Sequence, residues 1–235
     1  VRALLAADVD TFRRRLIVVD GAFSMDGDLF PLDELVPLAR EFDAWTYVDD
    51  AHGTGVLGEH GRGSAEHFGV EGEIDVTMGT LGKALGEACA FVDGSSTFIE
   101  FLLQRARAFV FPTASPPALA AATLEALRIL GSEPWRREAL RRNARRLRAG
   151  VAALGWRIAG AEDACIVPVM IGASDETMRI GNALREGGFL VGAVRPPTVP
   201  LGTWRLGITV TAAHTPEQID GLLQAFQRAV ASPTA

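Results

Sequence analysis

Lys83 is the only lysine among the 23 lysine and arginine residues of this 235-residue chain. Arginine stays protonated at any accessible pH, whereas a desolvated lysine can lose its proton and form a Schiff base with a carbonyl group. Lys83 lies between Gly82 and Gly86, just after the apolar run 74–78, and not on a charged helical face. This position favours a reactive amine, although an arginine-rich composition that left one surface lysine by chance explains the count equally well.

Polar side chains follow three apolar runs that are predicted to be strands. Ser24 follows the first run, Asp49 and His52 follow the second, and Thr80 and Lys83 follow the third. The carboxyl ends of parallel strands meet at one edge of a sheet, where α/β proteins bind their ligands. We therefore expect these side chains to converge on one ligand.

These residue types suit a pyridine cofactor that carries an aldehyde and a phosphate. An aspartate can keep a ring nitrogen protonated, which turns the ring into an electron sink. A histidine can form a hydrogen bond with a ring hydroxyl, and a threonine hydroxyl can help to bind a phosphate. The lone lysine supplies the amine for a Schiff base with the aldehyde.

Two other kinds of site are weaker interpretations. Asp49, Asp50 and His52 are candidate metal ligands, but magnesium or zinc needs further ligands at a spacing that the sequence lacks. A dinucleotide site is disfavoured because no G-x-G-x-x-G motif follows a predicted strand. Three glycines of the segment after the second strand resemble a phosphate loop only weakly: Gly53, Gly55 and Gly58.

The elements that would position these residues alternate between strand and helix. A helix is expected from Pro31, although Pro37 should kink it or shift its start. Alternation of this kind predicts a mainly parallel sheet with helices on both faces. The short apolar runs typical of buried parallel strands cover residues 16–19, 44–48, 74–78 and 88–92.

The second half of the chain changes character. Ser95 and Ser96 can each cap a helix that continues to Ala106, and further helices are expected over 118–130 and 135–154. Beyond them, strands are expected over 165–170, 189–194 and 205–210, with helices over 175–186 and 215–230. We expect a partial large domain over residues 1–131 and a small α/β domain over 132–235.

Bulk properties exclude several classes of protein. The net charge of −6 gives no basic surface for nucleic acid, and the arginine-rich run 135–154 is more typical of a solvated helix face. No apolar run approaches the ~18 residues of a membrane span. The two cysteines fit a reducing, cytoplasmic compartment without disulfides. The chain begins at Val1 and soon enters a strand, which is typical of a piece of a longer protein.

Three motifs in fixed order resemble the α-oxoamine synthases over nearly the whole chain. These motifs are Asp20–Asp28 (DGAFSMDGD), Val48–Gly55 (VDDAHGTG) and Thr80–Lys83 (TLGK). The resemblance implies the aspartate aminotransferase-like fold, fold type I, with the family's N-terminal part missing. It also implies pyridoxal 5'-phosphate as cofactor and the condensation of an amino acid with an acyl-CoA or acyl-ACP, with loss of CO2. A homodimer with a shared active site is implied as well.

The resemblance assigns a role to each matching residue. Lys83 forms the Schiff base and moves protons at the substrate α-carbon, Asp49 pairs with the ring nitrogen, and His52 contacts the ring hydroxyl. Ser24 lies beside the cofactor and Thr80 contacts the phosphate. The remaining matching residue is Thr113, which reaches the phosphate from the partner subunit.

The run Arg195–Pro200 (RPPTVP) is similar to the branch of this family that joins L-alanine to a pimeloyl thioester in biotin synthesis. Arg195, Thr198 and Arg205 are the candidate substrate contacts. Where the family usually has Arg-Leu-Arg, with the second arginine on the substrate carboxylate, this chain has glycine at position 207. Two alternatives stay open: a glycine-using member of the family, like 2-amino-3-ketobutyrate CoA ligase or 5-aminolevulinate synthase, and a truncated remnant without turnover.

Overall fold

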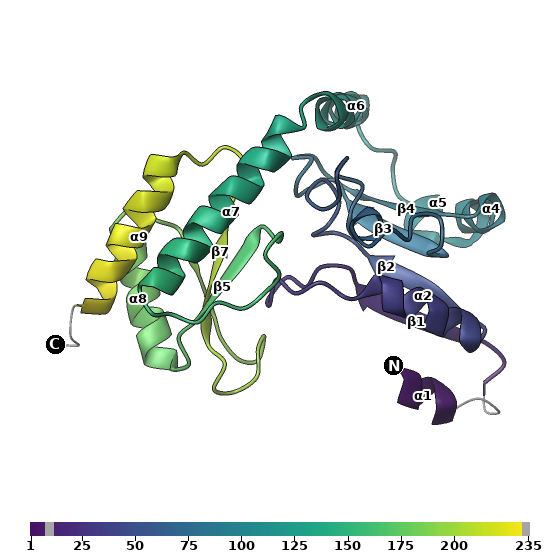
Figure 1. Ribbon diagram of the computed structural model, residues 1–235. Coiled ribbons are helices and arrows are strands. Elements are labelled where there is room, and N and C mark those ends of the chain that lie inside the picture. The colour runs from purple at the N-terminus through teal and green to yellow at the C-terminus, as the bar shows by residue number, and fades with distance from the viewer. Residues whose placement is uncertain (8–11, 232–235) are drawn as a thin grey trace. The chain divides into compact units, whose positions relative to one another are not determined.

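The computed structural model describes residues 1–7 and 12–231, which divide into two compact units (Figure 1). Unit 1 comprises Val1–Ala22 and Leu29–Glu133, and unit 2 comprises Phe23–Asp28 and the chain from Pro134 onward. The division falls close to the expected boundary at residue 131. The assignment of Phe23–Asp28 to unit 2 was not expected from the sequence. Residues 232–235 of the predicted small domain lie outside the described residues.

Unit 1 contains a four-stranded sheet in the order β1-β2-β3-β4. Strands β1 (Arg15–Asp20), β2 (Ala44–Asp49) and β3 (Val76–Thr80) are parallel, as predicted, whereas β4 (Ala90–Gly94) is antiparallel to β3. The reversal has a local cause, because the short connection between β3 and β4 cannot form the crossover that a parallel pair needs. The strand predicted over 88–92 therefore begins later and runs in the opposite direction.

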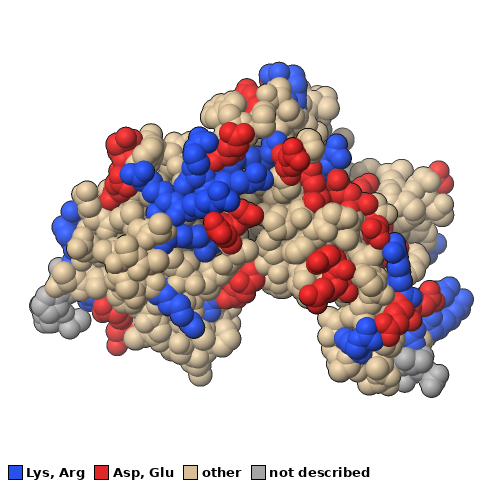
Figure 2. Space-filling model, viewed as in Figure 1, with Lys and Arg blue, Asp and Glu red and all other residues tan. Residues whose placement is uncertain are grey.

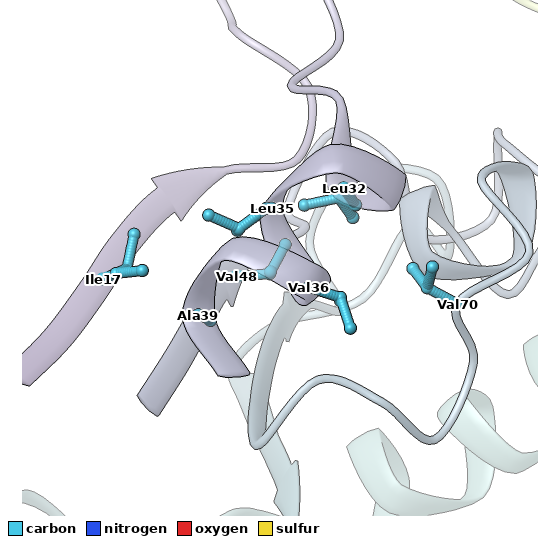
Figure 3. Packing of buried hydrophobic residues seen from close by; sticks show 7 residues of the cluster. All are labelled: Ile17, Leu32, Leu35, Val36, Ala39, Val48 and Val70. Atoms are coloured by element: carbon cyan, nitrogen blue, oxygen red, sulfur yellow. The ribbon is translucent and has the colours of Figure 1, made fainter. Parts of the chain in front are cut away.

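The core of unit 1 lies between the sheet and α2 (Leu32–Glu41). Residues from both elements, together with Val70 from the connection between α3 and β3, form one buried cluster: Ile17, Leu32, Leu35, Val36, Ala39, Val48 and Val70 (Figure 3). Pro31 precedes the first turn of α2, and Pro37 lies inside an uninterrupted helix. Side chains alternate between the two faces of a strand, and Leu16, Val18 and Trp45 remain exposed. The expectation that helices cover both faces is therefore wrong for the described part of β1 and β2.

Five further helices complete the described part of unit 1. The Phe98 N–H donates to Ser95 Oγ (3.3 Å), which confirms the predicted cap of α4 (Ser96–Arg105). No residue of α4, α5 or α6 is buried. The helices other than α2 and α4 in this unit are α1 (Arg2–Ala7), α3 (Ser64–His67), α5 (Arg107–Val110) and α6 (Pro117–Ser132).

Unit 2 packs three helices with a three-stranded antiparallel sheet in the order β5-β7-β6. Leu147, Val167 and Phe226 are among its fully buried side chains. The strand predicted over 189–194 is shortened to Gly192–Val194, and Leu190 is exposed. The elements are α7 (Trp135–Ala153), β5 (Ile166–Met170), α8 (Ser174–Glu186), β6 (Gly192–Val194), β7 (Arg205–Thr209) and α9 (Pro216–Ala231).

Helix α7 carries a dense group of arginine side chains, visible as blue atoms in Figure 2. Several of them lie next to carboxylates. Arg145 Nε is 3.2 Å from Glu162 Oε1, and Arg146 Nη2 is 2.6 Å from Asp220 Oδ2. The positive charge of this helix face is thus partly balanced within the unit.

Candidate functional site

The carboxyl ends of β1, β2 and β3 lie side by side at one edge of the unit 1 sheet. Asp20 is paired in register with Asp49, and Asp49 with Met78. Beyond the strands, the Asp50 N–H donates to Met78 O (2.7 Å). The Asp49 carboxylate is held in place because its Oδ1 accepts a hydrogen bond from the Ala51 N–H (3.0 Å). The register therefore places an oriented carboxylate at the centre of this edge.

His52 and Lys83 lie close enough for their charges to interact. Burial lowers the pKa of His52, and the positive charge of Lys83 lowers it further, while Asp49 and Asp20 raise it. The half-buried imidazole is thereby biased toward its neutral form, in which one ring nitrogen donates and the other accepts. Thr80 joins the same group, since its hydroxyl donates to Ala51 O (3.5 Å).

Lys83 lies on a closed turn between β3 and β4. The Leu81 N–H donates to Cys89 O (3.0 Å), and the Glu87 N–H donates to Leu81 O (2.8 Å). The side chain of Lys83 is exposed. The segment after β2 packs against this turn, because a Cβ added to Gly55 would lie only 2.7 Å from the Cβ of Ala84. A glycine is needed there both for that contact and for its φ of +81°.

Asp50 is a buried carboxylate that the sequence did not single out from its neighbour Asp49. It is 1% exposed, and both of its oxygens accept the Ser64 N–H, at 3.2 and 3.1 Å. Burial raises its pKa to about 6, partly offset by hydrogen bonds from Ser64 and Thr54. Three glycines leave space for it and have no room for a Cβ on that side: Gly21, Gly53 and Gly63.

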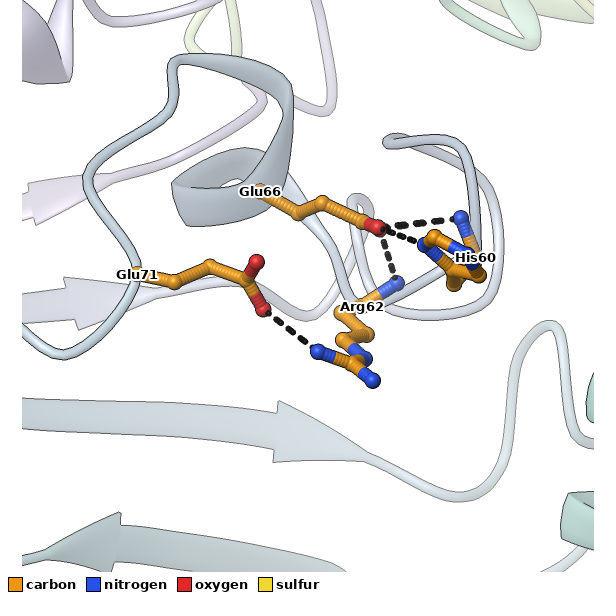
Figure 4. A network of polar contacts seen from close by, with 4 residues as sticks. All are labelled: His60, Arg62, Glu66 and Glu71. Atoms are coloured by element: carbon orange, nitrogen blue, oxygen red, sulfur yellow. Dashed lines mark hydrogen bonds and ion pairs between the residues drawn. The ribbon is translucent and has the colours of Figure 1, made fainter.

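A second carboxylate braces the far end of the same glycine-rich segment, as Figure 4 shows. Glu66 accepts the backbone N–H groups of His60 (3.0 Å) and Arg62 (2.9 Å), and lies 2.6 Å from His60 Nδ1. Arg62 Nη1 in turn lies 3.3 Å from Glu71 Oε1. Asp50 and Glu66 together fix the path of residues 51–63, the segment that contains His52.

Four predicted site residues thus lie together in unit 1: Asp49, His52, Thr80 and Lys83. Thr113 is exposed in the connection between α5 and α6. Ser115 of that connection approaches the lysine turn, with its Oγ 3.7 Å from Cys89 Sγ.

The other predicted residues belong to unit 2. Ser24 lies in the Phe23–Asp28 segment, and Arg195 and Thr198 are exposed in the connection after β6. Arg205 is 3% exposed and forms an ion pair with Asp26. Its guanidinium is therefore already occupied, which the sequence pattern did not indicate.

The described residues contain no group of three or more His, Cys, Asp or Glu side chains that could hold a metal ion. Over the same residues, no helix combines the length and the apolar character needed to cross a membrane.

Comparison with known sequences identifies a family. The sequence model of the family described as Aminotransferase class I and II matches residues 1–226. The chain is 55% identical over 231 residues to the 8-amino-7-oxononanoate synthase of Methylococcus capsulatus, covering 97% of this chain and 59% of that protein. It is 52% identical to the 8-amino-7-oxononanoate synthase of Alkalilimnicola ehrlichii, covering 92% of this chain and 56% of the relative. The chain therefore spans somewhat more than half the length of these relatives.

Solved structures show the same fold. A serine palmitoyltransferase variant from S. paucimobilis, solved with bound PLP-myriocin, superposes with a TM-score of 0.90 at 34% identity, covering 97% of this chain and 58% of that one. The 8-amino-7-oxononanoate synthase of Francisella tularensis superposes with a TM-score of 0.81 at 26% identity, covering 96% of this chain and 66% of that one. The predicted aspartate aminotransferase-like fold is thus confirmed. With the family match extending over almost every residue, the chain belongs to the aminotransferase class I and II family.

Proposed function

We propose that this chain binds pyridoxal phosphate and serves an α-oxoamine synthase, which condenses an amino acid with an acyl thioester and releases CO2. The observation that carries the proposal is the convergence of Asp49, His52, Thr80 and Lys83 on one edge of a parallel sheet. Family membership and the names of the relatives support it.

The donor set fits this cofactor. The Asp49 carboxylate, oriented by the Ala51 N–H, would pair with the ring nitrogen. Neutral His52 would form a hydrogen bond with the ring hydroxyl, and Thr80 would contact the phosphate. Thr113 would reach the phosphate from a partner subunit, and Ser24 would lie beside the ring.

When bound, the cofactor would supply an electron-poor ring that takes up the electron pair released at the substrate α-carbon. The chain's own residues do the rest. Lys83 would hold the cofactor covalently through Nζ and, once displaced by the substrate amine, would move a proton at the α-carbon. Asp49 would keep the ring nitrogen protonated, and Arg195 and Thr198 would contact the substrates, whereas the guanidinium of Arg205, the third predicted contact, is already engaged by Asp26 and Thr203.

The cofactor is tested by adding pyridoxal phosphate to the purified chain and recording the visible absorption of a lysine Schiff base. We expect a band for the wild type and none for Lys83→Arg, which keeps the positive charge but cannot form the Schiff base. His52→Ala should weaken binding, while His67→Ala, at an exposed histidine, should not. A wild-type chain without the band would disprove cofactor binding by this chain.

We propose L-alanine and a pimeloyl thioester as the substrates, and biotin synthesis as the pathway, because the relatives named 8-amino-7-oxononanoate synthase share up to 55% identity with the chain. The chain is also 35% identical to a serine palmitoyltransferase of known structure. The amino acids tested as substrates should therefore include L-serine and glycine besides L-alanine. Release of CO2 from carboxyl-labelled amino acids with several acyl thioesters would rank the substrates. Faster release with glycine or serine would reassign the specificity.

We also propose a homodimer in which Thr113 serves the site of the other subunit. Co-expression of Lys83→Ala and Thr113→Ala chains would test it, because mixed dimers would contain one intact site. Recovery of activity in the mixture supports sharing. Activity that stays at the level of the separate variants would contradict it.

A further inference from the structure

The Arg205 guanidinium is enclosed by contacts within unit 2. Its side chain is 4% exposed, and it lies on β7, the central strand of the sheet. Nε donates to Thr203 O (3.0 Å), Nη2 donates to Thr203 Oγ1 (3.0 Å), and Nη1 pairs with Asp26 Oδ1. All three nitrogens form contacts within unit 2, so the guanidinium has no free pair of N–H groups to donate to a ligand.

Asp26 lies on the Phe23–Asp28 segment, which leaves unit 1 after Ala22 and returns to it at Leu29. The segment folds on itself, since the Phe23 N–H donates to Asp28 O (2.9 Å) and the Gly27 N–H donates to Phe23 O (2.8 Å). It is therefore a compact loop tip and not an extended linker.

Backbone contacts hold the same loop tip to unit 2 independently of the ion pair. The Ala161 N–H donates to Gly27 O (2.9 Å). A Cβ on Gly27 would lie 2.8 Å from Ile166 O, and a Cβ on Gly160 would lie 2.6 Å from Asp26 O. Two glycines thus allow backbone to pack on backbone, and the Arg205–Asp26 pair closes the contact from the side-chain direction.

The ion pair is unequal, because the Arg205 side chain is 4% exposed while that of Asp26 is 45% exposed. A buried guanidinium that loses its carboxylate partner is strongly destabilising, whereas an intact pair contributes mainly to a defined geometry. The pair is thus suited to fixing the position of the loop tip.

We propose that Arg205 is a positioning residue: through Asp26 it fixes the Phe23–Asp28 segment, and with it Ser24, to the unit 2 sheet. The substrate carboxylate is then left to another group, for which the exposed Arg195 is the available arginine in the neighbouring connection. We call the contact of Asp26 with Arg205, together with the backbone contacts of Gly27, the clasp. The role of Ser24 and of the substrate rests on the proposed function, whereas the clasp itself does not.

Hydrogen exchange tests the clasp without any cofactor or substrate. Asp26→Asn and Arg205→Lys should each accelerate exchange of the Phe23 and Gly27 amides by about tenfold, and the double variant should add little more. Amides of β5 should be unaffected in Asp26→Asn, which keeps the shape of the side chain. Independent, additive effects of the two substitutions, or no acceleration in Asp26→Asn, would overturn the clasp.

Steady-state kinetics with amino-acid and acyl-thioester substrates separate positioning from substrate binding. Under the proposal, Asp26→Asn and Arg205→Lys share one phenotype, a lower kcat with an unchanged KM for the amino acid, and Arg195→Lys raises that KM. If Arg205→Lys raises the KM and Asp26→Asn does not, Arg205 is a substrate anchor and the proposal is wrong. Absence of cofactor binding in the wild type would instead disprove the proposed function and leave the exchange result standing.

Discussion

At the scale of single residues, two adjacent aspartates have different surroundings. Asp49 is partly exposed at the sheet edge and oriented by one backbone N–H, whereas Asp50 is 1% exposed and enclosed by glycines. In the sequence, these two aspartates are equivalent carboxylates. The surrounding chain leaves Asp49 accessible to a ligand and buries Asp50 inside the fold.

Asp50 should make stability depend on pH. Its pKa is 3.8 unfolded and about 6 folded, so the folded state retains a proton that the unfolded state has lost between those values. Stability contributed by this group is present below about pH 4 and is lost as the pH rises to 6, by on the order of 3 kcal/mol. Urea unfolding should therefore show that the free energy of unfolding falls less between pH 4 and pH 7.5 for Asp50→Asn than for the wild type.

The exposed Asp33→Asn variant on α2 controls for a general effect of removing one negative charge. If the free energy of unfolding changes with pH in the same way for the wild type and Asp50→Asn, a buried Asp50 that titrates is contradicted.

Gly207 offers a gain-of-function test that rests on the proposed function. A Cβ at this position would lie 3.3 Å from Val194 Cγ2, so a side chain fits after a small shift of Val194. Gly207→Arg should lower the KM for the amino acid by about tenfold, because a guanidinium binds a carboxylate through two hydrogen bonds. Gly207→Ala is the control for the shift alone, and an equal KM in both variants would contradict the expectation.

At the scale of elements, the glycine-rich segment 51–63 is a fixed scaffold and not a flexible phosphate loop. Asp50 accepts hydrogen bonds from Thr54, near the start of the segment, and from Ser64, just after its end, and Glu66 accepts them from His60 and Arg62 near its far end. Because it also packs on the lysine turn, this segment sets where His52 stands relative to Lys83.

Gly55→Ala should therefore destabilise unit 1 more than Gly69→Ala. Both glycines have positive φ, which costs an alanine roughly 1 kcal/mol, but only Gly55 meets a neighbour, Ala84, while nothing lies within 4 Å of Gly69. The difference in the free energy of unfolding measures the contact alone. Gly55→Ala should also weaken binding of pyridoxal phosphate, and equal losses for both variants would exclude the packing of this segment on the lysine turn.

At the scale of the whole molecule, the two units have separate cores. Leu35 is buried between α2 and the sheet of unit 1, and Leu147 is buried in α7 of unit 2. Unit 2 also includes a segment that the sequence places in the middle of unit 1.

Leu147→Ala should cost about 2–5 kcal/mol and accelerate hydrogen exchange in β5 and α9. Leu35→Ala, of equal chemistry, should accelerate exchange in β1 and β2 instead. In Leu147→Ala, hydrogen exchange of the Phe23–Asp28 amides should accelerate together with that of unit 2. If their exchange rates stay unchanged, like those of β1, the assignment of that segment to unit 2 is wrong.

The sequence by itself determined the lone lysine, the strand ends that carry Asp49, His52 and Thr80, the cap at Ser95 and the order of nearly all elements. These features depend on local periodicity and on residues a few positions apart. Only the tertiary structure decided that Asp50 is buried and that Arg205 pairs with Asp26, 179 residues away in the chain. The partner of a charged side chain depends on which distant segments pack together, and no local pattern records that choice.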